Sequence, residues 1–595
     1  MATAYENEKH QSPTSSEEDI VAVKGTQTGV RAIEAAQSVW GPKSKIVLWI
    51  SIALASYMYI LDNGTNWAWG SYATIQFGHY QQFAAIQCAT SILLAIGKPL
   101  FAKLTDAVGR GESIAIALFF YVLGYIINAT TPNMAGLGAG SCIWMLGFSG
   151  LQIALQIVIA DVTTLRWRPI VSTLSSGGWY FINFYANGQI TAKLTAVGGL
   201  GWRYGYGIYA IAYIPALSPI IVVLLWAQRR AKKLGKLSGA SIEPTSRPPI
   251  SQRFKKFVEE VDAVGLFFLA ATLALIFLPI VLAGGAYATT NWHNPAVPAM
   301  MVIGGVVAFP LFVYWEAKRA TFPVIPWRLL RNRTILAGCA IDFFDFVSFY
   351  LTYSELYGFV SATTDWKIDN LVYYSNAQSL SLTFFGILWA SIAGYFKTGY
   401  KYSLIGALAL RILGVGLMFY ARSHTSIAAL VMTQIIQGAG GGIAATAVQI
   451  GVQGAVPHQD VALATAAVLL AAEVGGVVGT AAAGAIWQNR LPVEIAKHLP
   501  ALNSTEIATY VGAPTLVRGL TGDDHANMVT AYSAAMHTLL IPGIVVAILP
   551  LIAAFFVKDF RLLQIQNAVE VKKLDGRRAE DAGESIEPGM LQTRV

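Results

Sequence analysis

The sequence is short of charge, cysteine and histidine. Only 12% of its 595 residues are charged, and it holds 3 cysteines and 8 histidines. A soluble chain of this length would divide into several domains with about a quarter of charged residues, so the shortage excludes a water-soluble globular protein. Cys88, Cys142 and Cys339 each lie in an apolar run, which favours free thiols in a packed core over disulfides or metal ligands.

Motifs of enzymes are also missing. The sequence contains no G-x-S-x-G, no Walker motif and no H-E-x-x-H. The small-residue stretches at 437–442 and 473–479 do not follow a strand, so they favour close packing of helices over nucleotide binding. We therefore expect no catalytic residues, no resident metal and no cofactor.

Long apolar runs stand in place of the missing charge. Hydrophobic residues make up 55% of the chain, and its mean hydropathy is +0.52. Runs of about 20 residues, the length that crosses a hydrocarbon core, recur throughout. They predict an all-α polytopic membrane protein in contact with lipid, with about fourteen spans. The predicted spans are 46–66, 83–103, 113–131, 135–160, 169–192, 204–226, 264–284, 297–315, 335–360, 371–396, 403–421, 427–455, 461–487 and 531–556.

Basic residues are concentrated in alternate loops. Lys103 and Arg110 lie in one short loop and QRRAKKLGK, at 228–236, lies in another, whereas the loops at 285–295 and 363–370 hold almost none. Because the cytosolic loops of membrane proteins collect Lys and Arg, both termini are predicted to be cytosolic. The same asymmetry accounts for the net charge of +8, so no nucleic-acid partner is expected.

The spans divide into two bundles of six with two helices inserted between them. Such an arrangement predicts a substrate site between the bundles, near the middle of the membrane. The predicted segments are a cytosolic tail at 1–44, a first bundle at 45–227, a cytosolic linker at 228–263, two additional spans at 264–316, a second cytosolic linker at 317–333, a second bundle at 334–557 with an extracellular loop at 488–530, and a cytosolic tail at 558–595.

Four carboxylates fall inside predicted spans: Asp62, Asp342, Asp345 and Glu473. A carboxylate at the centre of a membrane helix costs about 2.5–3.5 kcal/mol, so its presence suggests a use. Burial favours the neutral form of a carboxyl group, which lets it take up and release a proton. We predict proton coupling for these four, with contact to water at a span end as the alternative. Arg411 is expected to pair with a carboxylate or a carbonyl group.

Polar side chains recur at helical spacing on several spans. Tyr180, Asn183 and Asn187 share one face of the fifth span. Amides and phenols can hydrogen-bond a carbonyl-rich ligand without a fixed charge, although they can also bond one span to another. The predicted substrate-binding residues are Asn63, Trp67, Gln152, Gln156, Tyr180, Asn183, Asn187, Tyr353, Tyr373, Tyr374, Gln434 and Gln437.

The turn after the second span carries a recognisable signature. Asp106, Gly109 and Arg110 in TDAVGR match D-x-x-G-R, the loop signature of the major facilitator superfamily, although Ala102 replaces its usual glycine and the second basic residue after Arg110 is missing. With about fourteen spans and two middle helices, the chain resembles the fourteen-helix branch of that superfamily. The resemblance implies the major facilitator fold and a gating role for Asp106, Gly109 and Arg110.

Longer segments are similar to the fungal siderophore–iron transporters. They are the stretch from LDNGTNW to TDAVGR, then IADVTTLRWRPIVS and WYFINFYANGQIT, and the resemblance covers nearly all of 45–557. It implies proton-coupled import of ferric siderophores, most simply of the hydroxamate type, across a fungal plasma membrane. We also expect a monomeric protein and allow for a vesicular pool beside that in the plasma membrane. The siderophore already saturates the iron, so the protein needs no ligands for it.

The predicted extracellular loop carries an aromatic and a cation, Tyr510 and Arg518, suited to an oxygen-rich chelate. The resemblance implies that the loop captures substrate, and a merely solvated loop is the alternative. Asn503 opens N-S-T, a weak acceptor motif for glycosylation. Two other functions stay open: an antiporter that exchanges protons for drugs or glutathione-like peptides, and a nutrient sensor that transports nothing.

Overall fold

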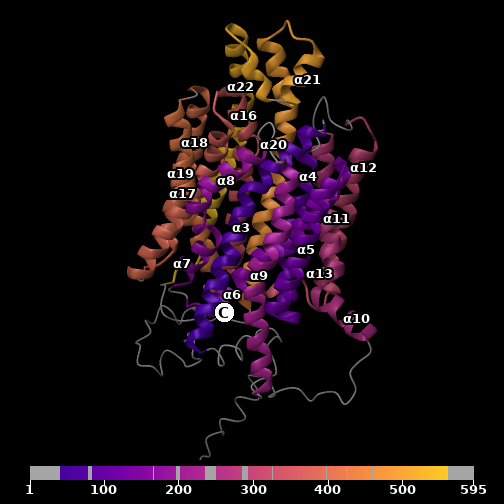
Figure 1. Cartoon of the computed structure of the whole chain (residues 1–595), viewed down its shortest axis with the longest axis vertical. Helices are drawn as coiled ribbons and strands as arrows, with labels where there is room; N and C mark the ends of the chain where they lie inside the picture. Colours follow the sequence, from indigo (N-terminus) through magenta and orange to yellow (C-terminus); the bar gives the residue numbers. More distant parts are fainter. Residues whose placement is uncertain are drawn as a thin grey trace, which may run out of the picture.

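The protein is a bundle of long helices. The computed structural model describes residues 41–77, 83–164, 167–195, 201–234, 250–283, 292–324, 326–396, 398–424, 426–457, 460–512 and 514–560. Among these residues, thirteen helices are long and apolar enough to cross a membrane. Figure 1 shows the long helices running side by side along the longest axis of the molecule. The prediction of an all-α polytopic membrane protein is confirmed.

The first half of the chain, called here the N-half, spans residues 42–233. Its elements are α3 (Pro42–Gln76), α4 (Phe83–Val108), α5 (Arg110–Thr130), α6 (Met134–Val162), α7 (Arg168–Thr173), η2 (Leu174–Gly178), α8 (Tyr180–Thr195) and α9 (Trp202–Lys233). Asn133 caps α6, because its side chain accepts a bond from the amide of Gly136 at 2.9 Å. Gly109 has a φ of +118°, which favours a residue without a side chain. It lets α4 and α5 join through a single residue.

The span predicted at 169–192 is interrupted. It consists of α7, the five-residue π-helix η2 and the sixteen-residue α8, so it is not among the thirteen long apolar helices. π-helical turns are rare and are frequent at functional sites. Gly177 in this turn lies against α17 (Ile368–Phe396), where a Cβ atom would be 2.3 Å from Thr383 Oγ1. The interruption therefore lies where the two halves of the protein approach each other.

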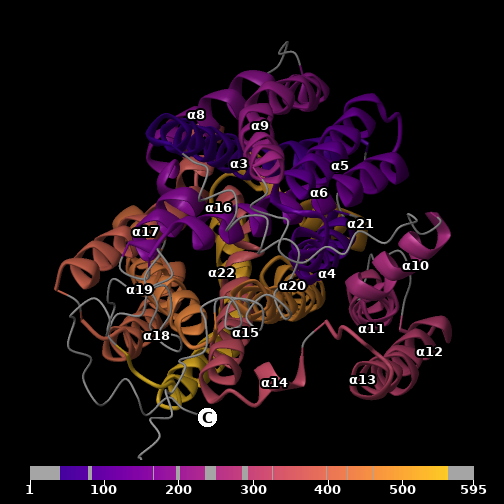
Figure 2. The same cartoon turned by 90° about the horizontal axis from the view of Figure 1, so that it is seen from below.

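Two additional helices lie between the halves in sequence and at the edge of the bundle in space, the first beside α4 and α20 (Val461–His498) and the second packed on the first (Figure 2). We call them the middle pair. They are α11 (Ala263–Leu282) and a second helix formed by α12 (Ala296–Val302), η4 (Ile303–Ala308) and α13 (Phe309–Lys318), and α10 (Ile250–Val261) precedes them. Asp262 caps α11 through the amide of Gly265 and also accepts the indole N–H of Trp315. Lys103 of α4 donates to the carbonyl of Phe322, which attaches the end of the middle pair to the N-half.

The remaining helices form the C-half, residues 327–554. Its elements are α14 (Trp327–Leu330), α15 (Arg333–Tyr353), α16 (Leu356–Thr363), α17, α18 (Lys401–His424), α19 (Ile427–Gly454), α20, α21 (Ser504–Gly512), η6 (Pro514–Gly519) and α22 (Asp523–Ala554). α20 has 38 residues, so at 1.5 Å per residue it is about 57 Å long. It extends beyond the neighbouring helices at one end of the bundle.

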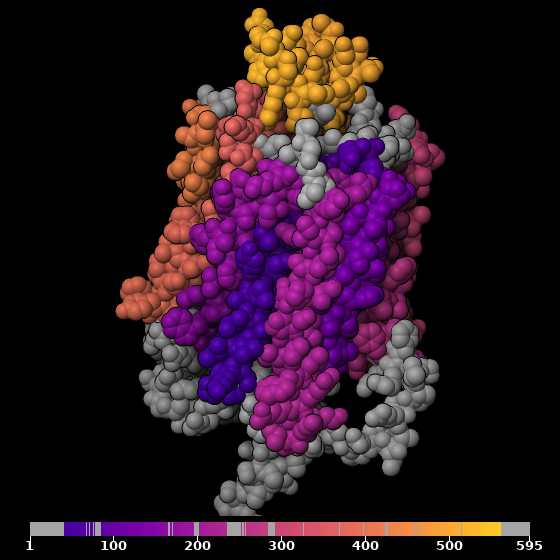
Figure 3. Space-filling model, in the orientation of Figure 1, coloured from indigo at the N-terminus to yellow at the C-terminus, as the bar shows by residue number. Residues whose placement is uncertain are grey.

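The two ends of the bundle differ. α21 and η6 project at one end, called here the cap end, whereas α3 begins and α22 ends at the opposite, base end (Figure 1, Figure 3). The segment at 488–530, predicted to be an extracellular loop, is mostly helical, and we call residues 499–522 the cap. Asn503 and Glu506 explain the difference, because the backbone amide of each bonds the side chain of the other at 2.8 Å, which starts α21. Glycosylation of Asn503 stays a prediction.

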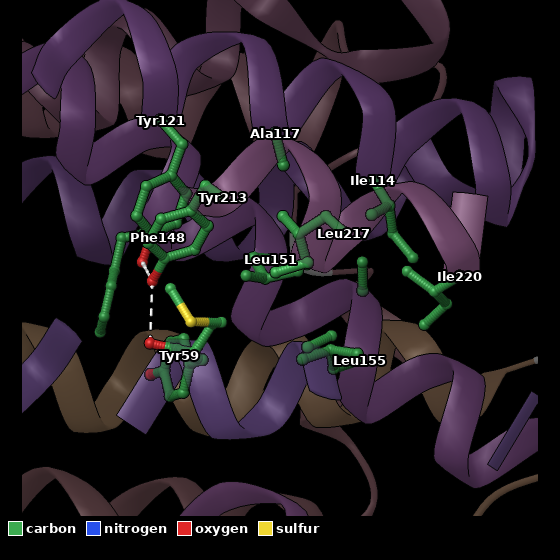
Figure 4. Packing of buried hydrophobic residues seen from close by; sticks show 14 of the residues in the cluster. Tyr59, Ile114, Ala117, Tyr121, Phe148, Leu151, Leu155, Tyr213, Leu217 and Ile220 are labelled. Carbon is green, nitrogen blue, oxygen red and sulfur yellow. Dashed lines mark hydrogen bonds between the residues drawn. The ribbon is translucent and has the colours of Figure 1, made fainter. Parts of the chain in front are cut away.

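The halves meet along two pairs of helices. α4 packs against α20, and α8 packs against α17, whereas α5 and α9 lie on the far side of the N-half (Figure 2). α5, α6 and α9 enclose an apolar core of their own (Figure 4). In it the rings of Tyr121 and Tyr213 stack with centroids 4.2 Å apart, and Phe148 lies beside them. This core packs the helices of the N-half together, and it also reaches Ala466 of α20 in the C-half.

Candidate transport site between the two halves

An ion pair joins the halves far from either end of α4 and α20. The ammonium Nζ of Lys98 on α4 lies 3.3 Å from Glu473 Oε1 on α20. The same ammonium donates to Gln152 Oε1 on α6. The side chain of Lys98 is 0% exposed and that of Glu473 is 10% exposed. The predicted carboxylate Glu473 therefore faces a cation from the opposite half, in a place that is almost closed to water.

Two polar contacts join the halves nearer the base end. Gln449 Nε2 of α19 donates to Gln156 Oε1 of α6 at 2.8 Å. Thr173 Oγ1 of α7 lies 3.2 Å from Thr446 Oγ1 of α19. Gln152 and Gln156 are four residues apart on α6 and share one face. Two of the predicted substrate-binding residues thus lie at the interface between the halves, where they bond protein groups in this arrangement.

Tyr373 joins the halves nearer the cap end. Its ring, on α17, stacks on Phe184 of α8 with centroids 5.2 Å apart and on Tyr185 with centroids 6.4 Å apart. Its hydroxyl accepts a hydrogen bond from Gln189 Nε2 of α8 at 3.1 Å. Tyr373 was predicted to line a substrate chamber, and these contacts show that it also holds α8 and α17 together.

Replacing Gly188 with alanine is expected to loosen this contact. A Cβ atom at Gly188 would lie 2.4 Å from the ring of Tyr373, a distance that forces the ring to move. We expect the G188A variant to populate arrangements in which α8 and α17 are farther apart at the cap end. Spin labels at the exposed positions Lys193 and Lys367 would measure that separation by double electron–electron resonance.

The matched control for this prediction is Gly207→Ala. A Cβ atom at Gly207, on α9, meets nothing within 4 Å, so the G207A variant should keep the parental distances. An unchanged distance distribution in both variants would contradict a role for Tyr373 in holding the cap end closed.

Asp62 points into the N-half rather than between the halves. Its carboxylate accepts hydrogen bonds from the hydroxyl of Tyr121, at 2.7 Å, and from that of Tyr125, both on α5. Tyr213 of α9 donates to the Tyr121 hydroxyl at 3.2 Å. We call these three tyrosines the tyrosine cage. Asp62 is 0% exposed, so it does not reach water at a span end, and its contacts favour a role in holding α3 against α5 and α9.

The neighbouring Asn63 faces a different helix. Its Nδ2 donates to the hydroxyl of Tyr180 on α8 at 3.0 Å, and Asn63 itself is exposed. Asn183 Nδ2 donates to a backbone carbonyl of α3 at 3.3 Å, and Asn187 packs so closely on Gly64 that a Cβ there would be 1.7 Å from Asn187 Nδ2. The predicted stripe on α8 therefore bonds and packs against α3, as the interhelical alternative requires.

Arg411 of α18 is paired with Asp345 of α15. Its Nε lies against Asp345 Oδ1, and its Nη2 donates to the backbone carbonyl of Asp345 at 2.9 Å. The expected pairing of Arg411 with a carboxylate or a carbonyl is confirmed. Asp342, one turn earlier, interacts electrostatically with both residues. Because a fixed cation already holds Asp345, its contacts favour a structural role over proton transfer.

The other predicted lining residues of the C-half bond within that half. The bonds run from Gln434 to the Tyr374 hydroxyl at 3.3 Å, from Gln437 to Thr352 Oγ1 at 3.5 Å, and from the Tyr353 hydroxyl to the carbonyl of Ser375 at 3.1 Å. They connect α15, α17 and α19. The side chain of Trp67 lies outside the described part of the structure.

The signature turn forms a buried charged cluster at the base end. Arg110 Nη1 lies 3.1 Å from Asp106 Oδ1, and Arg110 Nε lies 3.0 Å from Asp161 Oδ2 of α6. Gly109 occupies the single residue between α4 and α5. The three residues of the signature are thus brought together with Asp161. This cluster ties the end of α4 to the end of α6, which is compatible with the gating role that the resemblance implies.

Arg518 attaches the cap to the C-half. Its Nε donates to the carbonyl of Ser361 at 2.8 Å, and its Nη1 donates to that of Trp366 at 2.9 Å. Tyr510 is half-buried, and its carbonyl accepts a bond from the Tyr532 hydroxyl of α22 at 2.8 Å. The guanidinium of Arg518 is therefore engaged with protein carbonyls, which favours anchoring of the cap over the predicted capture of cargo.

Replacing Arg518 with alanine is expected to release the cap. The change removes two hydrogen bonds from a charged donor, each worth about 1.5–3 kcal/mol. We expect faster hydrogen exchange of the α21 amides in the R518A variant, measured by mass spectrometry. The control Lys497→Ala removes a side chain that is 68% exposed and should leave that exchange unchanged. A raised KM with unchanged exchange would instead support the capture role.

Sequence reasoning overlooked Lys98, Asp161, Gln449 and the tyrosine cage. Lys98 does carry a signal, because a lysine inside an apolar run costs as much as the carboxylates that were considered. Tyr121 and Tyr125 recur at four-residue spacing and so share one face of α5. Gln449 has no comparable signal, since it is one of several glutamines along α19.

Metal-binding groups and disulfides were not expected. Among the described residues, no group of three or more His, Cys, Asp or Glu side chains is placed to hold a metal ion. The three cysteines are free thiols; Cys88 is buried, and Cys142 and Cys339 are half-buried.

Two halves of long apolar helices that meet along paired helices define a multi-pass membrane transporter with the major facilitator fold. The crystal structure of tetrameric PepTSo2 is similar to this chain, with a TM-score of 0.50 at 12% identity, covering 86% of this chain and 98% of that one. A comparison with models of protein families finds no match.

Sequence relatives narrow this class. The chain is 31% identical over 586 residues to the siderophore transporter fer7 of Mycosarcoma maydis, covering 94% of this chain and 88% of the relative. It is 30% identical over 560 residues to the low affinity heme transporter str3 of Schizosaccharomyces pombe, covering 91% of this chain and 87% of the relative. The chain belongs to the fungal siderophore–iron transporter family of the major facilitator superfamily. It is a transporter and not an enzyme.

Proposed function

We propose that this protein imports ferric siderophores of the hydroxamate type across the plasma membrane, driven by protons. The observation that carries the cargo is similarity along the whole chain to a relative named as a siderophore transporter. The arrangement of the halves supports a cargo path between α4 and α8 of the N-half and α17 and α20 of the C-half. The halves contact each other near the base end and near the cap end. Breaking one set of contacts while the other stays intact would open the cargo path at one end of the protein at a time.

The pair between Lys98 and Glu473 supports proton coupling. It is buried and joins the two halves, and a carboxylate in such a place is a common element of proton relays. One proton that moves through about 100 mV supplies about 2.3 kcal/mol. That energy concentrates a neutral cargo about fifty-fold, since about 1.4 kcal/mol corresponds to one decade. Asp62 and Asp345 have their partners within one half, whereas Glu473 is paired across the two halves, so we assign the proton to Glu473.

The base end is proposed to face the cytosol. The last turn of α9 carries Arg230, Lys232 and Lys233 at that end, and cytosolic segments collect such residues. The cap then lies outside the cell. This orientation places both termini in the cytosol.

Uptake in a yeast strain without its own siderophore transporters tests the proposal. Cells that express this protein would receive a panel of radio-iron-loaded hydroxamate siderophores, with and without a protonophore. We expect accumulation of at least one chelate and its loss when the protonophore is present. Accumulation that a protonophore leaves unchanged would contradict proton coupling, and no accumulation of any siderophore would contradict the cargo.

Heme is a second candidate cargo, because one relative of similar identity is named as a low affinity heme transporter. Hemin therefore belongs in the same panel, and preferred uptake of hemin would replace siderophore import. Export of drugs or glutathione-like peptides, measured in the same cells, would favour the antiporter. If cells that express this protein take up no substrate but show an iron-dependent signal that control cells lack, the protein is a sensor rather than a transporter.

A further inference from the structure

The Lys98 ammonium has one acceptor in each half of the protein. Glu473 of α20 lies 3.3 Å away and Gln152 of α6 also accepts from it. Lys98 belongs to the N-half and Glu473 to the C-half, so any rearrangement that separates α4 from α20 pulls the ion pair apart. A buried charge that loses its partner is strongly destabilised. Lys98 therefore needs another anion, and Glu473 needs a proton, whenever the pair opens.

Among the described residues, Lys98 is the only cation that pairs with Glu473. In the described part of the chain, Tyr59 of α3 and Tyr350 of α15 also interact with it electrostatically. Of the helices packed against α20, α11 and α19 carry no titratable side chain. On α15, Asp345 is paired with Arg411, and Asp342 interacts electrostatically with both. In other neighbours of α20, Lys103 of α4 donates to the Phe322 carbonyl, and Asp106 of α4 and Asp161 of α6 pair with Arg110. Glu506 of α21 accepts from the Asn503 amide, and on α22 Tyr532 and His537 bond backbone carbonyls.

We infer that Lys98 and Glu473 form a charge-exchange site for cargo that carries an anionic oxygen. A carboxylate of the cargo takes the place of the Glu473 carboxylate on Lys98, and Glu473 takes up one proton from the water on the loading side. On release the proton leaves to the other side and the ion pair forms again. The exchange makes no covalent bond, and the net charge at the site stays constant. The inference rests on the proposed function and deepens it, because it selects siderophores with a free carboxylate. For such a cargo the proton crosses together with one negative charge, so the pH gradient rather than the membrane potential drives uptake.

Gln152 positions Lys98 for this exchange. Its carbonyl oxygen bonds the ammonium from the same half, so Lys98 keeps one neutral acceptor while its anionic partner changes. Pro99 follows Lys98 directly inside α4 and removes one backbone hydrogen bond of the helix there. Both features favour a lysine that can reorient locally.

A series of chelates that differ only in charge tests the inference. The probes are a linear iron–trihydroxamate chelate with a free amine, its acetylated neutral form and its succinylated form, which carries a carboxylate. The purified full-length protein would be titrated calorimetrically with each at about pH 5.5 and about pH 7.5, in buffers of different ionisation enthalpy. We expect the succinylated form to bind about tenfold more tightly than the neutral form at the lower pH, with about one proton taken up, since charge-assisted bonds supply that difference.

Variants separate the two partners. Lys98→Met should abolish the preference for the carboxylate, whereas Glu473→Gln should keep the preference and remove the proton uptake. Each single variant leaves one buried charge unpaired and could fail to fold. The double variant K98M/E473Q has no buried charge at the site and should fold like the parent, so the preference can still be measured in it. Lys255→Met, at a side chain 80% exposed, is the control and should match the parent.

Two results would overturn the inference. Equal affinity of the parent protein for the neutral and succinylated forms would exclude an anion site, and so would a carboxylate preference that persists in K98M or K98M/E473Q. Binding of none of the three chelates would instead contradict the proposed cargo, and the inference with it. Equal binding of the neutral and succinylated forms, with uptake of the neutral form into cells, keeps the proposed function and rejects only the charge exchange.

Discussion

Replacing Arg411 with methionine is expected to lower the stability of the protein by about 3–5 kcal/mol. The change leaves Asp345, which is 8% exposed, as a buried carboxylate without its cation, and removal of one partner from a buried ion pair costs that much. It also removes the bond to the Asp345 carbonyl. Fluorescence-detected size-exclusion chromatography after heating in detergent would show a lower melting temperature and less folded protein.

Removing the negative charges at the same time should recover most of the stability. Asp342 also interacts with Arg411, so the compensating variant is D342N/D345L/R411M. Replacing a buried ion pair by apolar groups of similar size is often neutral. If the compensated variant melts as early as R411M, the loss comes from packing rather than from the unpaired charge. If R411M melts like the parent, the pair does not stabilise the fold.

Replacing Asp62 with alanine is expected to have the second largest effect. The hydroxyls of Tyr121 and Tyr125 would lose the acceptor that they share inside the N-half, and each unsatisfied buried group costs about 1–3 kcal/mol. The D62A variant should therefore melt earlier and reach the membrane in smaller amounts. Both quantities can be measured with a fluorescent protein fused to the chain.

A triple variant, D62L/Y121F/Y125F, separates structure from transport. It removes the donors together with their acceptor, a change that is close to neutral when shapes match. We expect it to fold and to accumulate cargo, because the carboxylate of Asp62 accepts its hydrogen bonds from α5 rather than from the C-half. If the triple variant folds but does not accumulate cargo, Asp62 takes part in proton coupling, as the sequence analysis predicted.

Hydropathy was enough to predict thirteen long apolar helices among the described residues, but neither the interruption of the span at 169–192 nor how each helix is rotated. Asp62 and Asn63 are adjacent in sequence, yet one bonds α5 and the other bonds α8. Successive helical residues differ by about 100° around the axis, since a turn has 3.6 residues. A run that is apolar all round gives no direction for this rotation. The sequence could therefore place Asp62 inside a span and could not tell a cage in the N-half from a chamber between the halves.

The partners of buried side chains were predicted best where the chemistry left few choices. A buried Arg411 had to find an acceptor, and Asp345 supplies it. The helical structure of the cap was harder to predict, because N-S-T-E matches a glycosylation motif and also the start of a helix. The reciprocal bonds of Asn503 and Glu506 resolve that start. Lys98 was missed, although a lysine inside an apolar run is as costly as the carboxylates that were considered.

The continuity of α20 has a practical consequence. The helix carries Glu473 within the bundle and leads without a break to the cap, which Arg518 ties to the C-half. An antibody fragment raised against the cap would thus tilt with the C-half as one body. Bound to a protein whose remaining mass is hidden in a detergent micelle, it would serve as an alignment marker for electron cryomicroscopy. The angle of the fragment would then report which end of the protein is open in each class of particles.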